Sequence, residues 1–427
     1  MNKENKIDNS VKLISIGGYG EFGNNCSIIT YKNNFIILDV GSGFASDLHH
    51  KKTTSFADEY HAKKLIDSGY KLLGIFISHA HLDHVGGLSD FLKDEEVNIF
   101  CTRFVAEFHK DNLKYNRLIV NVVEFEKEVT IGDFNIKYYP IQHSTPQSSL
   151  IKVKVKDKNI GYLSDWKMDF SPTLGKKSDF KYIAKKEKFT HLITDVTSIN
   201  KPITESESVA VSKVSSLLEM ASYYHDLLIV STFCSHIARL KIILEKAREL
   251  GRNVYCNKST YNAIKIGASL GYIQNSYFED CRLLEHHYDT IMENRSASLI
   301  LGSGHQYQRG STFLSLIERE SSYVFTKKEC FIQAASLIQK DLYPACRTKF
   351  QDFITKYKIP YYEGVHVGGH AGYIDHYYCL KDLKPKIVIP NHASLGNFAI
   401  FANLAKEQHY KLNKTLFLLL NDQSLTL

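Results

Sequence analysis

The chain has 427 residues, of which 44% are hydrophobic, 23% are charged and 12% are aromatic. This length exceeds one ordinary core and excludes a peptide hormone or a lone binding module, while the composition excludes a disordered or fibrous chain. The net charge of +7, from 53 basic and 46 acidic residues, permits a polyanionic partner without requiring one.

The sequence has no feature of a membrane or secreted protein. Its longest apolar stretches, such as residues 416–420, fall far short of the roughly 20 residues that a membrane-spanning helix needs. The first twelve residues are polar and contain lysines, so we expect no secretory signal. The eight cysteines form no CxxC pair, which disfavours a disulfide framework or a thiolate zinc module. We therefore expect a cytoplasmic protein without a membrane partner.

The first two hundred residues have the pattern of a β-rich domain with glycine-rich turns. The predicted strands cover residues 11–18, 26–31, 33–43, 71–78, 120–125, 134–141, 149–155 and 158–164. The third of these strands ends in Asp39 and a Gly-x-Gly turn. A helix is predicted over residues 58–69, and a further helix is expected to begin over residues 88–92.

The pattern changes at about residue 204. Thr204 and Glu207 have the spacing of a helix capping box, and apolar residues follow at helical period. Strands and helices then alternate over residues 226–233, 236–250, 253–256 and 259–271. This alternation predicts a parallel sheet with crossover helices, and so a second domain of α/β type. Short strands return from residue 358, and the last predicted strand covers residues 415–420.

Directly after a buried strand, four side chains that commonly bind metals lie within six positions: His79, His81, Asp83 and His84. Residues two apart on an extended stretch point the same way, so His79 and His81 would present two imidazoles to one metal. The turn that follows would present Asp83 and His84 to a second point nearby. The spacing therefore indicates two adjacent metal positions.

Further ligands are expected at the ends of later strands, where His143, Asp165 and His392 each close a β run. One end of a sheet would gather them into a single cleft. A lone buried histidine is more often a hydrogen-bonded core residue than a ligand, so each of the three taken alone is ambiguous. Together with the cluster of four, however, the set favours a metal centre.

The segment HAHLDHVGG, with Asp39 ahead of it and His143 and Asp165 after it, resembles the metallo-β-lactamase fold, a four-layer αββα sandwich that holds one or two metals. The spacing is 59 residues from His84 to His143, 22 from there to Asp165 and 227 from there to His392. The long last gap resembles the β-CASP subfamily of nucleic-acid-processing proteins, which carry an inserted α/β domain. The implied domains are a first metallo-β-lactamase part over residues 1–203, a β-CASP insert over 204–362 and a C-terminal metallo-β-lactamase part over 363–427.

Closer motifs resemble ribonuclease J within that subfamily and cover nearly the whole chain in the family's order. They are GGYGEFGNN, LDVGSGF, HSTP, SDWKMDFSP, TDVTSIN, STFCSHIAR, GSG, HVGGH and IPNHA. The resemblance implies that one metal is held by His79, His81 and His143, and the other by Asp83, His84 and His392, with Asp165 bridging. The implied catalytic residues are Asp83, His84, Asp195 and His370. Asp195 would orient a ligand histidine, and His370 would be the general acid.

The activity that the resemblance implies is hydrolysis of phosphodiester bonds in single-stranded RNA, by a water activated between two metals, as a 5′-to-3′ exonuclease, an endonuclease or both. Mixed histidine and carboxylate ligands suit several ions; we expect Zn²⁺, with Mn²⁺ and Mg²⁺ as alternatives. The implied RNA-binding residues are Ser235, His236, Arg239, Gly302, Ser303, Gly304, His366 and Gly368. Arg239 could equally lie on a solvated helix face, and GSG could be an ordinary glycine turn. A homodimer is compatible with the sequence.

Three features depart from ribonuclease J. Gly368 stands where serine is usual, residues 302–310 and 331–344 lack the family's usual loops, and the C-terminal domain of many bacterial members is not seen. A DNA nuclease on the same fold and a catalytically silent RNA-binding or scaffold protein are therefore alternatives. A small-molecule lactonase or glyoxalase is disfavoured, because the long insert would then have no evident purpose. The sequence leaves the RNA target, the mode of cleavage and the oligomeric state open.

Overall fold

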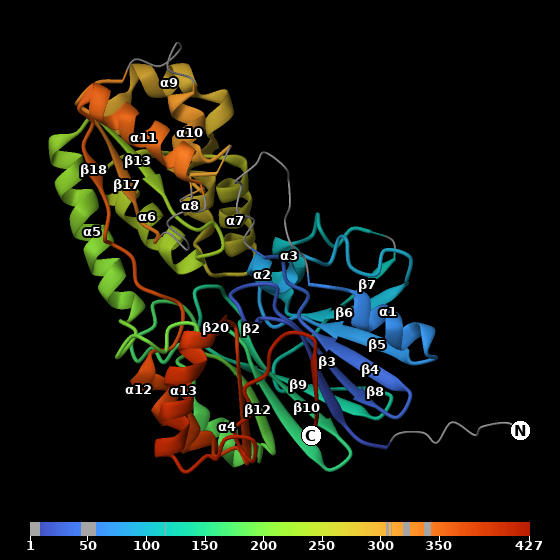
Figure 1. The fold of residues 1–427 in the computed structure, drawn as a ribbon. Coiled ribbons are helices and arrows are strands. Elements are labelled where there is room, and N and C mark those ends of the chain that lie inside the picture. Colours follow the sequence, from blue (N-terminus) through green and yellow to red (C-terminus); the bar gives the residue numbers. More distant parts are fainter. Residues whose placement is uncertain are drawn as a thin grey trace, which may run out of the picture.

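The computed structural model describes residues 9–43, 57–115, 117–304, 307–308, 310–318, 325–336 and 343–427. It contains a seven-stranded sheet, two six-stranded sheets and a two-stranded sheet (Figure 1). The seven-stranded sheet and one of the six-stranded sheets pack together in the lower part of Figure 1, and the other six-stranded sheet lies above them with its own helices.

The seven-stranded sheet forms one inner layer of the sandwich. In spatial order it contains β21 (Gln423–Thr426), β1 (Lys12–Gly17), β3 (Cys26–Tyr31), β4 (Asn34–Leu38), β5 (Lys71–Phe76), β6 (Val97–Cys101) and β7 (Leu118–Val122). Helices α1 (Tyr60–Asp67) and α3 (Arg103–Phe108) contribute to the apolar cluster on its outer face. Ile36 packs into the core between the sheets and Ile37 into the cluster with the helices, because successive strand residues point to opposite faces.

The second sheet forms the other inner layer. In spatial order it contains β19 (Ile387–Asn391), β12 (His191–Asp195), β11 (Lys158–Leu163), β10 (Ser149–Val155), β9 (Phe134–Pro140) and β8 (Glu128–Ile131). Helices α4 (Phe180–Lys186), α12 (Tyr373–Leu383) and α13 (Leu395–Glu407) pack on its outer face. One buried cluster joins both sheets, with Phe76 from the first and Tyr162 from the second. The expected αββα sandwich is thus confirmed.

The third sheet lies between β12 and β19 in the sequence and is entirely parallel. In spatial order it contains β15 (Cys281–Leu283), β14 (Asn253–Cys256), β16 (Ser298–Gly302), β13 (Leu227–Ser231), β17 (Glu329–Gln333) and β18 (Tyr361–Tyr362). The helices of this segment are α5 (Glu207–Tyr224), α6 (Ile237–Glu249), α7 (Lys258–Ser269), α8 (Asn275–Glu279), α9 (Tyr288–Glu293), α10 (Thr312–Ile317) and α11 (Pro344–Tyr357). The expected α/β insert with a parallel sheet is confirmed.

Two neighbouring strands of the second sheet bracket this insert. β12 and β19 pair in parallel, with Asp195 opposite Asn391 at their C-terminal ends. The short strand β20 (Ala393–Ser394) follows β19 and pairs with β2 (Tyr19–Gly20) near the chain start. The chain therefore leaves the sandwich and returns to it at adjacent positions.

Three local predictions were wrong. The helix of the histidine motif is α2 (Leu82–Val85), and residues 88–92 form turns, because the Arg117 guanidinium donates hydrogen bonds to four carbonyl oxygens between Leu88 and Leu92. Helix α5 is capped by Ser206, not Thr204. Residues 415–420 form a single bridge with β19, whereas the terminal strand is β21. Within the described ranges, no helix is both long and apolar enough to cross a bilayer.

Candidate metal centre

The site lies where several strands of the two packed sheets end. His79 and His81 follow β5, and Asp83 and His84 lie in α2. The three later candidates follow the C-terminal ends of β9, β11 and β19, and they are His143, Asp165 and His392. The expected convergence of these seven side chains is present in the structure, in two groups that share Asp165.

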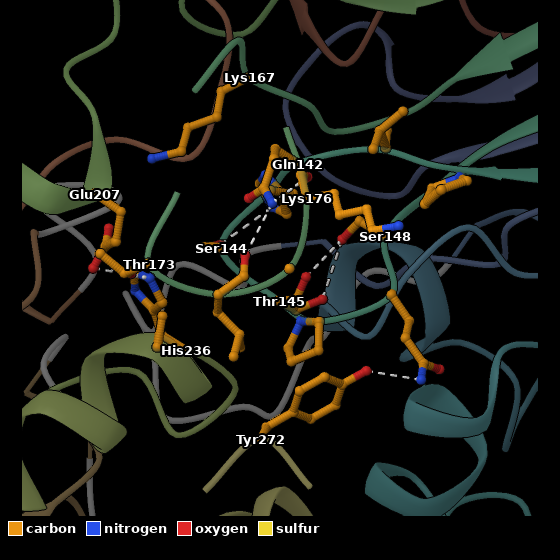
Figure 2. Close-up of a pocket in the computed structure, with 18 of the residues that line it drawn as sticks. Gln142, Ser144, Thr145, Ser148, Lys167, Thr173, Lys176, Glu207, His236 and Tyr272 are labelled. Atoms are coloured by element: carbon orange, nitrogen blue, oxygen red, sulfur yellow. Dashed lines mark hydrogen bonds and ion pairs between the residues drawn. The ribbon is translucent and has the colours of Figure 1, made fainter. Parts of the chain in front are cut away.

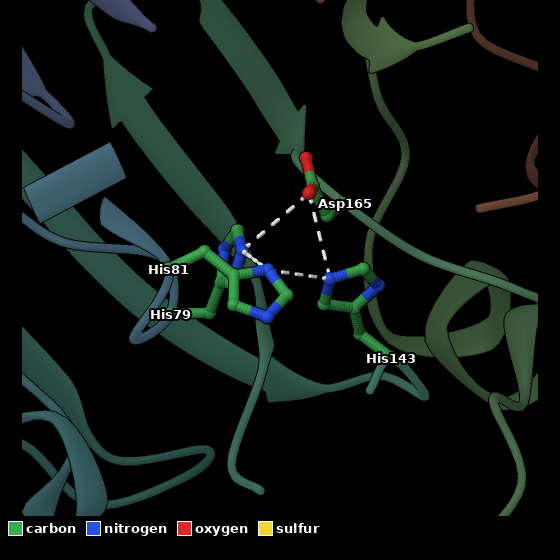
Figure 3. Close-up of side chains that lie close together, drawn as sticks. All are labelled: His79, His81, His143 and Asp165. Atoms are coloured by element: carbon green, nitrogen blue, oxygen red, sulfur yellow. Dashed lines mark hydrogen bonds and ion pairs between the residues drawn. The ribbon is translucent and has the colours of Figure 1, made fainter. Parts of the chain in front are cut away.

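The first group contains three imidazoles and one carboxylate oxygen, which point toward one another (Figure 3). His81 Nδ1 lies 3.2 Å from His79 Nε2 and 3.0 Å from His143 Nε2. Asp165 Oδ2 lies 3.5 Å from both His79 Nε2 and His143 Nε2. Two ligands that each lie about 2.0–2.1 Å from a tetrahedral zinc are about 3.3 Å apart, so these spacings fit one metal ion.

The second group uses the other oxygen of the same carboxylate. Asp165 Oδ1 lies 3.1 Å from His84 Nε2 and 3.3 Å from His392 Nε2. Asp83 Oδ2 lies 3.2 Å from His392 Nε2 and 3.8 Å from His84 Nε2. Asp165 Oδ1 is buried and has no hydrogen-bond partner among the described residues. A buried carboxylate oxygen is costly unless a positive charge compensates it, and a metal ion could supply that charge in place of protons on the two imidazoles, so this group also fits a metal.

The charges of the two groups differ. Burial lowers the pKa of His79 and of His143, and it lowers the pKa of His81 to about 3. These three imidazoles are therefore neutral at physiological pH, as a metal ligand must be. Each has a lone pair on the nitrogen that faces the others.

In the second group, nearby carboxylates together affect the pKa of the histidines more than burial does. Burial alone would lower the pKa of His392, but Asp165 and Asp83 raise it to about 10, and the same carboxylates with Asp39 raise the pKa of His84 well above its usual value. Burial would raise the pKa of Asp83 and Asp165, yet the neighbouring imidazoles hold it below its usual value. Cations that bind here would displace protons from His84 and His392.

Neighbouring groups orient the ligand histidines. His84 Nδ1 donates to Asp39 Oδ2 at 2.8 Å, and His143 Nδ1 donates to the carbonyl oxygen of Gly369 at 2.8 Å. Both bonds place the ring proton on Nδ1 and so leave the lone pair on Nε2, although the Asn25 amide nitrogen also lies 3.1 Å from His84 Nε2. The Gly23 amide donates to His392 Nδ1 at 3.4 Å, so this contact does not hold a proton on Nδ1 in the way that the bonds of His84 and His143 do.

Asp39 is a site residue for which no role was predicted. It is fully buried, has a positive φ of 59°, and accepts hydrogen bonds from the Ser78 amide at 2.7 Å and the Tyr162 hydroxyl at 2.9 Å, besides the bond from His84. The available signal was its place after a buried strand, ahead of a glycine turn. The Asp39 carboxylate thus fixes the imidazole of His84 through Nδ1, the ring nitrogen that faces away from the other side chains of the second group.

Asp195 binds a different histidine from the one expected. Its Oδ2 lies 2.9 Å from His370 Nδ1, and His370 is not among the predicted ligands. The other ring nitrogen, His370 Nε2, lies 3.7 Å from Asp165 Oδ2, and 23% of the His370 side chain is exposed. Burial would lower the pKa of His370, but Asp195 and Asp165 raise it, which favours a protonated imidazole beside the metal ligands.

The predicted RNA contact by Arg239 is wrong in this structure. Its side chain is completely buried, and its Nη2 lies 2.9 Å from Glu207 Oε1, while Nη1 donates to the carbonyl oxygens of Ala334 and Val365. The alternative of a solvated helix face is equally excluded. His236 is also buried, with Nε2 3.4 Å from Glu207 Oε1. Glu207, expected only as a capping residue, therefore holds two of the predicted contacts away from solvent.

The remaining RNA-binding candidates have varied surroundings. Ser235 is buried, and Ser303 Oγ is bonded to Asn257 and Ser259 within the insert. A Cβ on Gly302 would lie 1.8 Å from Thr312 Oγ1, so close packing accounts for that glycine. Gly304 has a φ of +99°, which favours glycine. His366 and Gly368 lie in the loop that leads to His370 and stay predictions.

A cavity of about 140 Å³ lies beside the first metal group, where the sandwich meets the insert. It is lined by residues 140–148, which include His143, by Lys167 and by residues of the insert. Figure 2 shows these lining residues, with Glu207 and His236 together at the left of the view, Gln142, Ser144 and Thr145 in its middle and Tyr272 below them. His143 of the first group thus borders a hollow between the two parts of the chain.

Family models match two parts of the chain. Residues 19–165 match the metallo-beta-lactamase superfamily, and residues 225–338 match the beta-CASP domain of ribonuclease J. The chain is similar to Ribonuclease J of Methanocaldococcus jannaschii, with 28% identity over 97% of this chain and 98% of that protein. It is 26% identical to Ribonuclease J of Pyrococcus abyssi, with 96% of both proteins covered.

Two further similarities concern a longer relative and a solved structure with a similar fold. Ribonuclease J of Helicobacter pylori strain J99 is 26% identical over 91% of this chain, which spans 57% of that longer protein. A crystal structure of a protein of unknown function from Enterococcus faecalis V583 matches with a TM-score of 0.65 and 14% identity, covering 98% of this chain and all of that one. The structural match supports the fold alone.

Proposed function

Since the chain belongs to the ribonuclease J-like branch of the β-CASP metallo-β-lactamase family, we propose that it is a metal-dependent ribonuclease that hydrolyses phosphodiester bonds of single-stranded RNA. One observation carries the proposal. The two oxygens of Asp165 face two separate groups of ligands, and His370 approaches the same carboxylate. Two adjacent cations with a proton donor beside them suit phosphodiester hydrolysis.

When bound, two such cations would lower the pKa of a water molecule between them and offset the negative charge of the phosphate. The side chains have distinct roles around them. The first ion would be held by His79, His81, His143 and Asp165, and the second by Asp83, His84, His392 and Asp165. His370 would protonate the leaving oxygen through Nε2, while Asp195 fixes its Nδ1. No protein nucleophile is needed.

We propose zinc as the ion, with manganese and magnesium as alternatives, because imidazole-rich groups with few oxygens suit zinc best. The relatives named Ribonuclease J in archaea and bacteria support RNA as the substrate. Cleavage would proceed as a 5′-to-3′ exonuclease, an endonuclease or both. A cytoplasmic location and a homodimer belong to the same proposal.

The test is cleavage of RNAs that share one sequence but differ at their ends. The metal-loaded protein is incubated with RNAs that carry a 5′-triphosphate, a 5′-monophosphate or no end at all, as circles, and the products are resolved by size. Mononucleotides from the monophosphorylated RNA would support exonucleolytic trimming, and linearised circles would support an endonuclease. Intact RNA in every arm would refute the proposal.

The same experiment also tests two alternative functions, a DNA nuclease and a silent RNA-binding protein. A single-stranded DNA of identical sequence tests the DNA nuclease, which would cut DNA at least as fast as RNA. The silent RNA-binding protein would retain RNA without cleaving it at saturating metal. The complete set of converging ligands argues against the silent alternative.

A further inference from the structure

The loop that carries His370 has a side chain from another segment beside it. Gly369, which precedes His370, accepts the hydrogen bond from the ligand His143 through its carbonyl oxygen. One residue earlier, a Cβ built on Gly368 would lie 3.7 Å from the ammonium nitrogen of Lys201, which is the nearest atom to it. The ammonium group of Lys201 therefore lies next to the loop that touches the metal centre.

The backbone of Lys201 is fixed to this loop. Its carbonyl oxygen accepts a hydrogen bond from the Tyr373 amide at 2.8 Å, and its own amide donates to Ser198 at 2.9 Å. Nearby, the Thr204 hydroxyl donates to the carbonyl oxygen of His370. A Cβ on Gly372 would lie 2.9 Å from the carbonyl oxygen of Lys201, so the two segments are in close contact. The backbone of Lys201 is thus bonded to the segment that directly follows His370.

In the part of the chain that the structure describes, the Lys201 ammonium has no anion within ion-pair distance. The Lys201 side chain is exposed, and among the described residues no carboxylate lies within 4.0 Å of its nitrogen. The acidic residue next in sequence, Glu205, pairs instead with Lys213 at 3.3 Å. An exposed positive charge beside the proposed hydrolytic centre, on a backbone bonded to the segment after His370, is suited to a phosphate group.

We propose that Lys201 binds a phosphate group of the RNA next to the metal centre, in the space that Gly368 leaves open. This inference rests on the proposed function, because it takes RNA as the substrate. The phosphate is either one within the RNA chain or the one at its 5′ end, since an ammonium group recognises both. The lack of a side chain at Gly368 lets the phosphate approach the ammonium and the loop together.

The test measures RNA binding to protein whose metals have been removed with a chelator, so that no RNA is cut. Wild-type protein, Lys201→Met and Lys201→Arg are titrated with a fluorescent single-stranded RNA at several KCl concentrations. Loss of one phosphate contact in Lys201→Met should weaken binding roughly tenfold at low salt. It should also reduce the slope of log K against log salt by about 0.7. Lys201→Arg keeps the charge and should bind nearly as wild type does.

Lys414→Met is the matched control. Lys414 is exposed and lies next to Thr415, whose carbonyl oxygen accepts from Val388 at the start of β19, whereas the site follows the other end of that strand. This variant should bind with the wild-type affinity and salt slope. An equal loss in Lys414→Met and Lys201→Met would overturn the proposal, because it would reflect net charge alone.

Two forms of the RNA, with a 5′-monophosphate and with a 5′-hydroxyl, separate the two kinds of phosphate. A defect of Lys201→Met confined to the 5′-monophosphate form assigns the end phosphate, and a defect with both forms assigns a phosphate within the chain. Wild-type affinity and slope in Lys201→Met with both RNAs would overturn the assignment. Failure of the loaded wild-type protein to cut RNA would instead refute the ribonuclease, so the two failures are distinguishable.

Discussion

His370 donates from Nδ1 to Asp195 Oδ2 at 2.9 Å, while its Nε2 lies 3.7 Å from Asp165, the carboxylate shared by both metal groups. If His370 protonates the leaving oxygen, His370→Ala should slow cleavage of RNA by about 10²- to 10⁴-fold. An RNA whose scissile 3′-oxygen is replaced by sulfur has a leaving group that needs no proton, and its cleavage should slow far less. The measurement is the ratio of the two rates, and an equal loss on both substrates would exclude the role of proton donor.

The metal ligands give a second prediction. Asp83→Ala and His84→Ala each remove a ligand of the second group, so cleavage should be abolished while the circular dichroism spectrum keeps the wild-type shape. Bound metal, counted by mass spectrometry after dialysis, should fall from about two ions per chain to about one, because the first group is intact. Full activity in either variant would contradict the assignment of these ligands.

Gly369, which precedes His370, should tolerate a side chain less well than a glycine with open space around it. A Cβ on Gly369 would lie 2.8 Å from His143 Cε1, so Gly369→Ala must displace a ligand imidazole. Positioning errors of this size lower rates by about 100-fold. A Cβ on Gly396, in α13, would meet its nearest atom at 3.8 Å, and Gly396→Ala is therefore the matched control, with cleavage within a few-fold of wild type. Equal cleavage rates in the two alanine variants would refute this packing argument.

The buried pair of Arg239 and Glu207 should contribute to stability. Arg239→Ala leaves the Glu207 carboxylate buried without its partner, which should cost about 3–5 kcal/mol of unfolding free energy, measured by urea denaturation. Arg248→Ala, in which an exposed arginine of the same helix is lost, should cost at most about 1 kcal/mol. Similar losses of unfolding free energy in both variants would show that the buried pair stabilises the protein no more than an exposed pair does.

The same pair predicts a pH dependence. Burial alone would raise the pKa of Glu207, but His236 and Arg239 hold it below its usual value in the folded protein. A carboxylate whose folded pKa is depressed stabilises the protein fully above its unfolded pKa of about 4.3 and loses this effect as the pH falls further. The stability difference between wild type and Glu207→Gln should therefore be constant near neutral pH and shrink below about pH 4. A difference that grows on acidification would contradict this sign.

Much of the fold was predictable because its signals are local. Alternation of strands and helices beyond residue 204 indicated the parallel sheet, and the strand ends at His143, Asp165 and His392 indicated the convergence of the ligands. The helix expected over residues 88–92 does not form, because Arg117, distant in the sequence, donates to its carbonyl oxygens. A local pattern contains no information about such a partner.

The candidate site likewise contains residues that a local pattern predicts and contacts that depend on distant parts of the sequence. Histidines at spacing two identified the first metal group, whereas the bond between Asp195 and His370 joins residues 175 positions apart and depends on the completed fold. Arg239 was expected to contact a phosphate because its motif, STFCSHIAR, resembles that of ribonuclease J. Its burial follows from Glu207, whose partner the sequence does not specify.

The neighbouring placement of β12 and β19 has an evolutionary consequence. Because the chain departs and re-enters at adjacent strands, with Asp195 opposite Asn391, the intervening sequence can lengthen, shorten or diverge without shifting the register of the sheet. Selection on substrate choice could thus reshape the insert while the catalytic scaffold stays unchanged.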